Sequence, residues 1–93
     1  MVDLSGRVID SWNELWDALQ KPCGLPTRFG RNLDAWNDTL GEGGISEVLD
    51  AHPALLIRVA PEGLFAPDRP EGTRFVETTQ TTGQGRVQVR ARP

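Results

Sequence analysis

Few residues in this chain can bind a metal or form a crosslink. The 93 residues include a single cysteine, Cys23, and a single histidine, His52. One cysteine cannot form an intramolecular disulfide, which agrees with a reducing compartment, and Cys23 fits the interpretation of a small core residue. His52 precedes Pro53 and fits the end of a helix. Because Cys23 and His52 are far apart and have no further ligand at metal spacing, we predict no metal site.

Long hydrophobic runs are also missing. No apolar run approaches the roughly 18 residues that span a bilayer, and the N-terminal MVDLSGRVID lacks a basic region followed by an apolar one. We therefore expect a cytoplasmic protein with no membrane contact. The glycines at position 6 and within residues 41–44 belong to neither a phosphate-loop nor a dinucleotide-binding pattern, so we expect no cofactor.

The charges are unevenly distributed along the chain. The net charge is −3 at pH 7, but residues 1–52 contain nine acidic and four basic residues, whereas residues 53–93 contain four acidic and six basic ones. An acidic N-terminal half argues against nucleic acid and favours a basic protein partner.

Three segments have helical signatures besides the helix described below. Ser11 and Glu14 form a capping-box pattern ahead of a one-sided apolar stripe that ends before Pro22. A short helix is predicted over Ile45–His52. The stretch Thr73–Thr82 is compatible with helix or strand, and we favour a helix. The apolar stripe that follows the capping box consists of Trp12, Leu15, Trp16 and Leu19.

Three segments have strand signatures. Val2–Ile9 is predicted as an opening strand. Ala54–Ala60 is a nearly continuous apolar run that predicts a central strand buried on both faces. A loop is predicted over Pro61–Gly72, and the alternating residues Arg86–Arg92 predict a half-exposed strand. Strands separated by helices favour a parallel arrangement, so we predict one α/β domain over residues 1–93, with a three-stranded parallel sheet packed with three or four helices.

The most informative segment is a short helix that follows a loop containing Gly30. Asn32 is placed to cap this helix, and Gly41 to end it in a left-handed conformation after about two turns. Asp34 and Asp38 lie one turn apart and therefore share a face. The opposite side carries the apolar residues Leu33, Trp36 and Leu40.

The two aspartates allow several interpretations. Like charges at this spacing repel by roughly 0.2–0.5 kcal/mol, so Asp34 and Asp38 do not stabilise the helix by standing together. The ordinary interpretation is a solvated polar face. A general acid and base pair is a second, but no histidine or lysine stands near enough in sequence to separate their roles, so we predict no enzyme. The third is a surface that meets cations on a partner.

The segment LPTRFGRNLDAWNDTL resembles the barstar family, the intracellular inhibitors of secreted microbial ribonucleases of the barnase type. The family pattern is Leu-Pro, two aromatics, Gly, any residue, Asn-Leu-Asp-Ala, two further residues and Asp. The resemblance implies a barstar-like α/β layer and a one-to-one complex with a secreted guanyl-specific ribonuclease, formed by a chain that is monomeric when free. It rests on Leu25, Pro26, Phe29, Gly30, Asn32, Leu33, Asp34, Ala35 and Asp38.

The resemblance also implies roles for single residues. Asp38 would enter the phosphate-binding site of the enzyme and meet its arginines, and Asp34 would make a second acidic contact. Asn32 and the backbone of Gly30 would touch the guanine-recognition loop. Arginine–carboxylate bonds are charge-assisted and often bidentate, so a pair of carboxylates can imitate a phosphate. The full set of predicted partner-binding residues is Asp38, Asp34, Asn32, Gly30, Arg28, Leu33, Asn37 and Glu42.

The chain departs from the family pattern where aromatic residues usually stand. Arg28, Asn37 and Gly43 each remove flat apolar contact area, so the target can be a different ribonuclease of the same broad class, bound through different anchors. The alternative function is a nucleic-acid-binding module that uses the C-terminal strand. A charged edge strand is the simpler interpretation of that segment. The residues that would share one face of the strand are Arg86, Gln88, Arg90 and Arg92.

Overall fold

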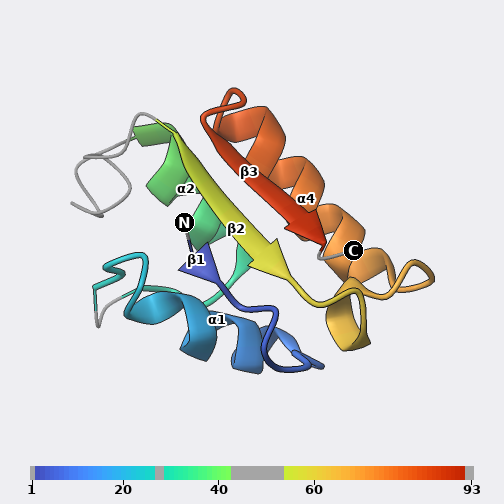
Figure 1. Cartoon of the computed structure of the whole chain (residues 1–93). Helices are drawn as coiled ribbons and strands as arrows, with labels where there is room; N and C mark the ends of the chain where they lie inside the picture. The colour runs from blue at the N-terminus through green and yellow to red at the C-terminus, as the bar shows by residue number, and fades with distance from the viewer. Residues whose placement is uncertain (1, 27–28, 43–53, 92–93) are drawn as a thin grey trace.

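Three parallel strands form the centre of the molecule (Figure 1). The structure is a computed structural model, and it describes residues 2–26, 29–42 and 54–91. The strands β1 (Val2–Asp3), β2 (Leu55–Val59) and β3 (Val87–Ala91) lie in the order β1-β2-β3, with Val2 beside Ile57 and Leu55 beside Val87. The predicted parallel sheet is therefore confirmed, and the apolar run Ala54–Ala60 supplies its central strand.

The first strand is much shorter than the predicted Val2–Ile9. The Asp3 carboxylate accepts hydrogen bonds from the Ser5 amide at 3.0 Å and from the Ser5 hydroxyl at 2.5 Å, and this local turn ends the strand. The Ser5 bonds also lower the pKa of Asp3. One further sheet bond follows the strand, from the Leu4 amide to the Arg58 carbonyl at 2.8 Å.

Helices pack on one face of the sheet. They are α1 (Trp12–Gln20), α2 (Leu33–Glu42) and α4 (Pro70–Thr82), with a short 3-10 helix, η1 (Gly63–Phe65). Figure 1 shows α2 and α4 behind the strands and α1 below them. The prediction that β2 is buried on both faces is wrong, because Leu56 and Arg58 on its other face are only half-buried. None of the described helices is long and apolar enough to cross a membrane.

The predicted helix at Thr73–Thr82 is confirmed, but it begins earlier, at Pro70. The segment Pro61–Gly72 is thus not a simple loop, since it contains η1 and the first residues of α4. Proline is favoured at the first position of a helix, where its missing N–H has no helical partner. A Cβ atom at Gly72 would lie 2.2 Å from the Leu64 carbonyl oxygen, so glycine is needed for α4 to approach η1 this closely. The helix predicted over Ile45–His52 lies outside the described residues.

The predicted end of α2 at Gly41 is wrong. The helix is ten residues long and continues through Gly41 to Glu42. Gly41 packs against α4, where a Cβ atom would lie 3.2 Å from Thr82 Cγ2. Arg86 donates a hydrogen bond to the Leu40 carbonyl at 3.4 Å, which satisfies an oxygen in the last turn. Tertiary contacts with α4 and with Arg86, the residue before β3, therefore support a helical turn that glycine alone would disfavour.

An aromatic cluster fills the space between the sheet and the helices. The Trp16 ring centroid lies 5.5 Å from that of Phe29, 6.2 Å from that of Trp36 and 6.1 Å from that of Phe75. Trp36 Nε1–H donates to Thr79 Oγ1 at 2.9 Å, and the Thr79 hydroxyl donates to the Phe75 carbonyl at 2.7 Å. Trp36, Phe75 and Thr79 are fully buried, so this chain of bonds joins α2 to α4 inside the core.

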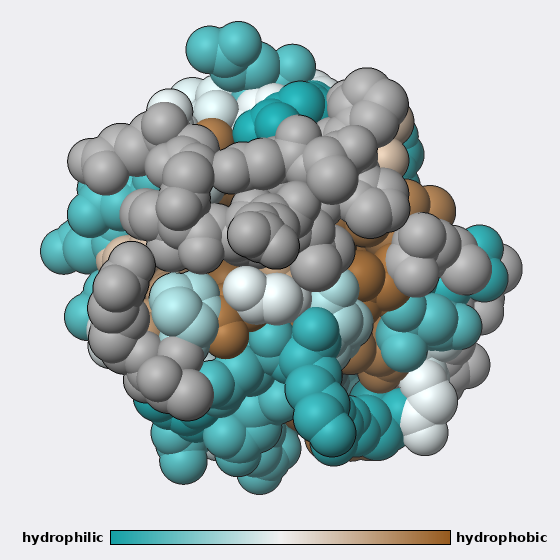
Figure 2. Space-filling view, turned by 90° about the vertical axis from the view of Figure 1, so that its left-hand side faces the viewer, coloured by the Kyte–Doolittle hydropathy of each residue, from teal (hydrophilic) through white to brown (hydrophobic). Residues whose placement is uncertain are grey.

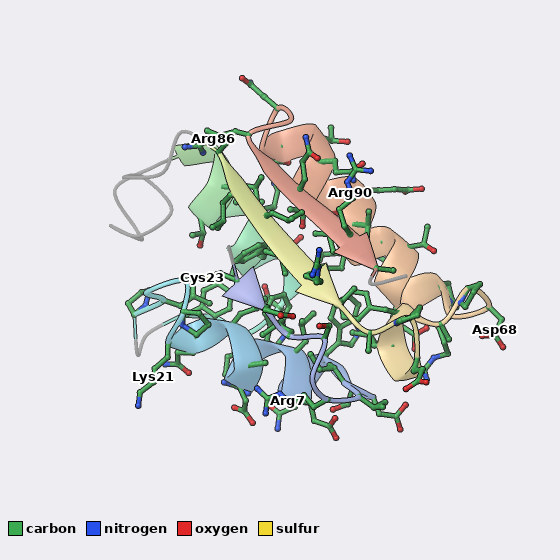
Figure 3. All side chains as sticks on the ribbon, viewed as in Figure 1. Arg7, Lys21, Cys23, Asp68, Arg86 and Arg90 are labelled. Carbon is green, nitrogen blue, oxygen red and sulfur yellow. The ribbon has the colours of Figure 1, made fainter. Side chains whose placement is uncertain are left out.

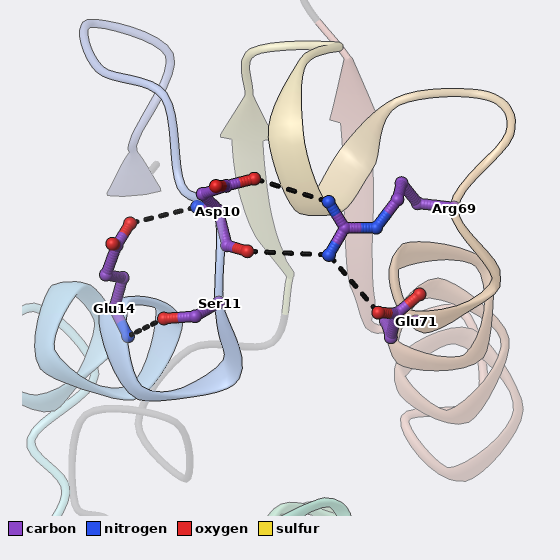
Figure 4. Close-up of polar contacts among 5 residues, drawn as sticks. All are labelled: Asp10, Ser11, Glu14, Arg69 and Glu71. Atoms are coloured by element: carbon purple, nitrogen blue, oxygen red, sulfur yellow. Dashed lines mark hydrogen bonds and ion pairs between the residues drawn. The ribbon is translucent and has the colours of Figure 1, made fainter.

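A second set of polar contacts joins the start of α1 to the start of α4 (Figure 4). The predicted capping box is confirmed in part. Glu14 N–H donates to Ser11 Oγ at 3.2 Å, but the Glu14 carboxylate accepts from the Asp10 amide at 2.9 Å rather than from the amide of the cap residue Ser11. Arg69 then donates to Asp10 at 3.3 Å and to Glu71 at 3.2 Å. The Arg69 bond lowers the pKa of Glu71.

Cys23 is a core residue. Its side chain is fully buried and belongs to the main hydrophobic cluster. Burial raises the pKa of the Cys23 thiol to about 12. A disulfide to a second copy of the chain would require this part of the fold to open.

Replacing Thr79 with valine should destabilise the protein by about 1–3 kcal/mol, because the buried Trp36 N–H then has no acceptor. Urea denaturation measures the change in the free energy of unfolding. Thr81→Val, at an exposed position of the same helix, is the control and should change it by less than about 0.5 kcal/mol. Equal effects of the two substitutions would show that the indole bond contributes nothing.

The buried thiol should make stability decrease at alkaline pH. Between its ordinary pKa of 9.0 and its folded value of about 12, the folded state keeps a proton that the unfolded state releases. The free energy of unfolding should therefore fall as pH rises above about 9, by up to roughly 1.4 kcal/mol per pH unit. Urea denaturation of Cys23→Ala across the same pH range should show a shallower decrease, and parallel curves would contradict the assignment.

Candidate functional site

The N-terminus of α2 is capped as predicted. Asn32 Oδ1 accepts a hydrogen bond from the Ala35 amide at 2.7 Å, and the Asn32 carbonyl accepts the first helical bond, from Trp36, at 3.1 Å. Asp34 lies in the first turn, where the positive end of the helix dipole favours a carboxylate. The cap therefore fixes where the helix begins and with it the direction of the side chains that follow.

The turn before this cap contains a residue in the left-handed conformation. The left-handed residue is Arg31, with φ of 53°, and Gly30 does not adopt such a conformation. The Arg31 guanidinium donates to Asn13 Oδ1 at 2.6 Å and to Asp17 at 2.8 Å, which ties the turn to α1. These contacts offset the strain of a left-handed arginine. A Cβ atom added at Gly30 would lie 3.2 Å from Ala35 Cβ, so glycine avoids a tight contact with the first turn of α2.

The two aspartates of α2 point away from the core. Asp34 and Asp38 are exposed, whereas Trp36 and Leu40 on the inner side are buried. Within the residues that the structure describes, neither carboxylate forms a hydrogen bond or an ion pair. Leu33 is partly buried and packs against the hydrophobic core. The outer side of α2 thus carries two unneutralised carboxylates one turn apart, while its inner side is packed in the core.

A groove runs between α2 and α4. It has a volume of about 300 Å³ and includes Asn37 from α2. Asn37 is a predicted site residue, and its side-chain oxygen accepts a hydrogen bond from the Thr82 hydroxyl. This oxygen therefore already has a partner within the protein. Glu77 is exposed on the α4 side of the groove and adds a third carboxylate to the surface. Sequence reasoning missed Glu77, because nothing in the sequence alone shows which face of α4 lies beside α2.

Two predicted site residues fall outside the described part of the chain. Arg28 lies between the described segments. Glu42 is the last residue of α2, but its side chain is also outside the described part.

The described surface is polar. Figure 2 shows the left-hand side of the molecule, where most of the described surface is hydrophilic and the hydrophobic residues that reach it lie close to grey ones. Among the described residues, Val8 is the only large hydrophobic side chain that is exposed. Recognition by the described surface would therefore depend mainly on charge and hydrogen bonding rather than on an apolar patch. The described residues also contain no group of three or more His, Cys, Asp or Glu placed to hold a metal ion.

Taken together, the fold and the site define a small α/β protein that presents an acidic helix, a surface suited to a cationic partner. A comparison with models of protein families matches residues 1–76 to the family described as Barstar (barnase inhibitor). That match covers most of the chain, and the protein belongs to the barstar family. A comparison with curated proteins finds no match. The family is thus one of inhibitors, and the predicted resemblance is confirmed.

Asn32→Ala should destabilise the protein by about 1 kcal/mol, because the Ala35 amide loses its acceptor. Asn32→Asp should leave stability nearly unchanged, since aspartate caps a helix about as well as asparagine. Thermal or urea denaturation of both variants measures the difference. If Asn32→Asp is as destabilised as Asn32→Ala, the cap is not what holds this end of α2.

Proposed function

We propose that this protein inhibits a secreted guanyl-specific microbial ribonuclease by placing the acidic surface of α2 in its active site, in a one-to-one complex. The observation that carries the proposal is the pair Asp34 and Asp38. Both are exposed and unneutralised within the described residues, on a helix whose inner side is fully packed.

The chemistry of the target explains why carboxylates would bind there. A ribonuclease must hold positive charge around the phosphate that it transfers. A carboxylate that meets those cations replaces the phosphate and blocks access by RNA. Arginine forms charge-assisted and often bidentate bonds with carboxylates, so two acids at a fixed spacing also determine the orientation of the complex.

The roles proposed for single residues are those that membership of the barstar family implies. Asp38, in the middle of α2, makes the main contact with the phosphate-binding arginines, and Asp34 makes the second. Asn32 and the Gly30 backbone contact the guanine-recognition loop. Glu77, across the groove, extends the acidic surface onto α4.

A rigid α2 supports this function. Trp36 stands between the two aspartates in sequence and is held by the buried bond to Thr79, while Asn37 is held by Thr82. A binding surface that is already ordered loses less conformational entropy when the complex forms. The core contacts of α2 thus increase affinity without touching the enzyme.

The positions that depart from the family pattern bear on the choice of target. Arg28 and Asn37 replace aromatic residues, so apolar contacts contribute less and polar contacts contribute more. The target is then a ribonuclease that offers acceptors or a carboxylate near Arg28.

We further propose that the protein is cytoplasmic, is monomeric when free, has no catalytic activity of its own, and protects the producing cell from a nuclease that the cell secretes.

Asp38→Ala should weaken inhibition by at least roughly 30-fold, since truncating one partner of a buried charge pair costs about 2 kcal/mol or more. The measurement is a titration of purified guanyl-specific microbial ribonucleases, following RNA cleavage. Asp68→Ala is the matched control, because Asp68 is also exposed and lies on a distant loop (Figure 3). The control should inhibit like the unmodified protein.

Two results would contradict the proposal. Equal inhibition by the Asp38→Ala and unmodified proteins would move the contact away from α2. Undiminished cleavage by every ribonuclease of this class, in the presence of the unmodified folded protein, would remove the proposed target.

A further inference from the structure

The face of the sheet opposite the helices carries arginines. Figure 1 shows the strands in front of α2 and α4, and Figure 3 shows Arg90 on β3 and Arg86 near the end of α2. The core-facing residues of the strands alternate with residues that are exposed or half-buried. On β2 and β3 these outward residues are Leu56, Arg58, Gln88 and Arg90. Arg86 directly precedes β3, and one of its N–H groups donates to the Leu40 carbonyl of α2.

Two of these arginines lie directly beside each other. Arg58 on β2 and Arg90 on β3 are register partners in the parallel sheet. Like charges on neighbouring strands repel and destabilise a sheet. Among the described residues, neither arginine forms an ion pair. Asp3 on β1 is the neighbour of Arg58 on the other side, and among the described strand residues it is the one carboxylate that faces this way. The charge of Arg58 also contributes to the lowered pKa of Asp3, so Asp3 offsets part of this repulsion, and an anionic ligand on the two arginines would relieve the rest.

The side chains on β3 form a connected row of donors. Arg90 donates to the Gln88 side-chain oxygen at 2.9 Å, and Gln88 donates to the Gly85 carbonyl at 3.3 Å. This row borders an open hollow of about 440 Å³ whose lining includes the half-buried Leu56 of β2. Most of the guanidinium N–H groups of Arg90 remain available for a ligand, because an arginine has five donors and the bond to Gln88 uses one of them.

We infer that this sheet face binds a single nucleic-acid strand through its phosphates. Gln88 and Arg90 are alternate residues of β3, about 6.6 Å apart, which is comparable to the spacing of successive phosphates along a nucleic-acid chain, and Arg58 lies beside Arg90 on β2. Arginine matches the geometry of phosphate oxygens and forms bidentate bonds with them. The hollow beside the row, which Leu56 helps to line, has room for a sugar or base next to the contacted phosphates.

The contacts on this face predict sequence-independent binding. All the described aromatic rings belong to the core cluster or pack against it, so this face offers no ring on which bases could stack. RNA and DNA strands should therefore bind alike. The sequence-based expectation that the chain avoids nucleic acid depended on the net charge along the sequence. The fold, however, places the acidic residues of α2 and these arginines on different surfaces. This inference does not depend on the inhibitor function.

The test is fluorescence anisotropy of a short labelled oligouridylate titrated with the protein at several salt concentrations. With Arg58, Arg86 and Arg90 each contacting one phosphate, the slope of log K against log salt should be about −2, which is a roughly 20-fold loss of affinity from about 50 to about 200 mM salt. The double variant Arg58→Gln, Arg90→Gln should retain a loss of only roughly threefold over this range.

Matched variants show whether a change in oligonucleotide binding comes from contacts on this face, from the overall charge of the protein, or from misfolding. Arg7→Gln removes an exposed arginine from a loop and should leave the slope unchanged. Asp3→Asn removes the carboxylate beside Arg58 and should strengthen binding, a gain that unfolding cannot produce. Asp38→Ala should not weaken RNA binding, although it should weaken inhibition.

Four results would overturn the inference. The first is the absence of saturable binding at low salt, and the second is a salt slope that Arg7→Gln reduces as much as the double variant does. The third is weaker binding by folded Asp3→Asn, and the fourth is binding of poly-glutamate in preference to the oligonucleotide. The last would assign the face to an acidic protein. A mass that rises with concentration in sedimentation, without RNA binding, would instead assign it to a second copy of the chain.

Discussion

The hydrogen bond from Trp36 to Thr79 is the contact on which the arrangement of the helices depends. It lies in the core and joins α2 to α4, and the Thr79 hydroxyl in turn donates a hydrogen bond to the Phe75 carbonyl. A buried indole N–H without an acceptor costs free energy. The packing of α2 against α4 therefore has to bring the Thr79 hydroxyl within hydrogen-bond distance of the Trp36 indole. The stacked Trp36 and Phe75 rings, with centroids 5.4 Å apart, add apolar contact to the same junction. This junction sets the direction in which the outer side of α2 points.

The fold then separates charge between two surfaces. The outer side of α2 carries Asp34 and Asp38 with no neutralising partner among the described residues, and the sheet carries Arg58 and Arg90 side by side. Each pair is unfavourable within the isolated protein. A partner of opposite charge would relieve each repulsion, and both surfaces are therefore suited to binding. Because they belong to different elements, one can be altered without altering the other.

The sequence contains enough information for the elements but not for their contacts. Periodicity and capping residues predicted α1, α4 and the Asn32 cap, because these signals are local. The short β1 was not predicted, since a turn from Ser5 to Asp3 competes with the strand. Arg31 was not predicted as the left-handed residue, because its conformation depends on contacts with α1. The position of Glu77 beside α2 likewise depends on how two distant helices pack.

The most direct test of the inhibitory role of α2 is to map amide shifts of the labelled protein by NMR while a catalytically inactive guanyl-specific ribonuclease is added. If α2 enters the active site, the changes should concentrate on Phe29–Glu42 and on α4 around Glu77, while β3 shows none. Changes that centre on Arg58 and Arg90, with α2 unaffected, would contradict the assignment of the acidic helix as the inhibitory surface.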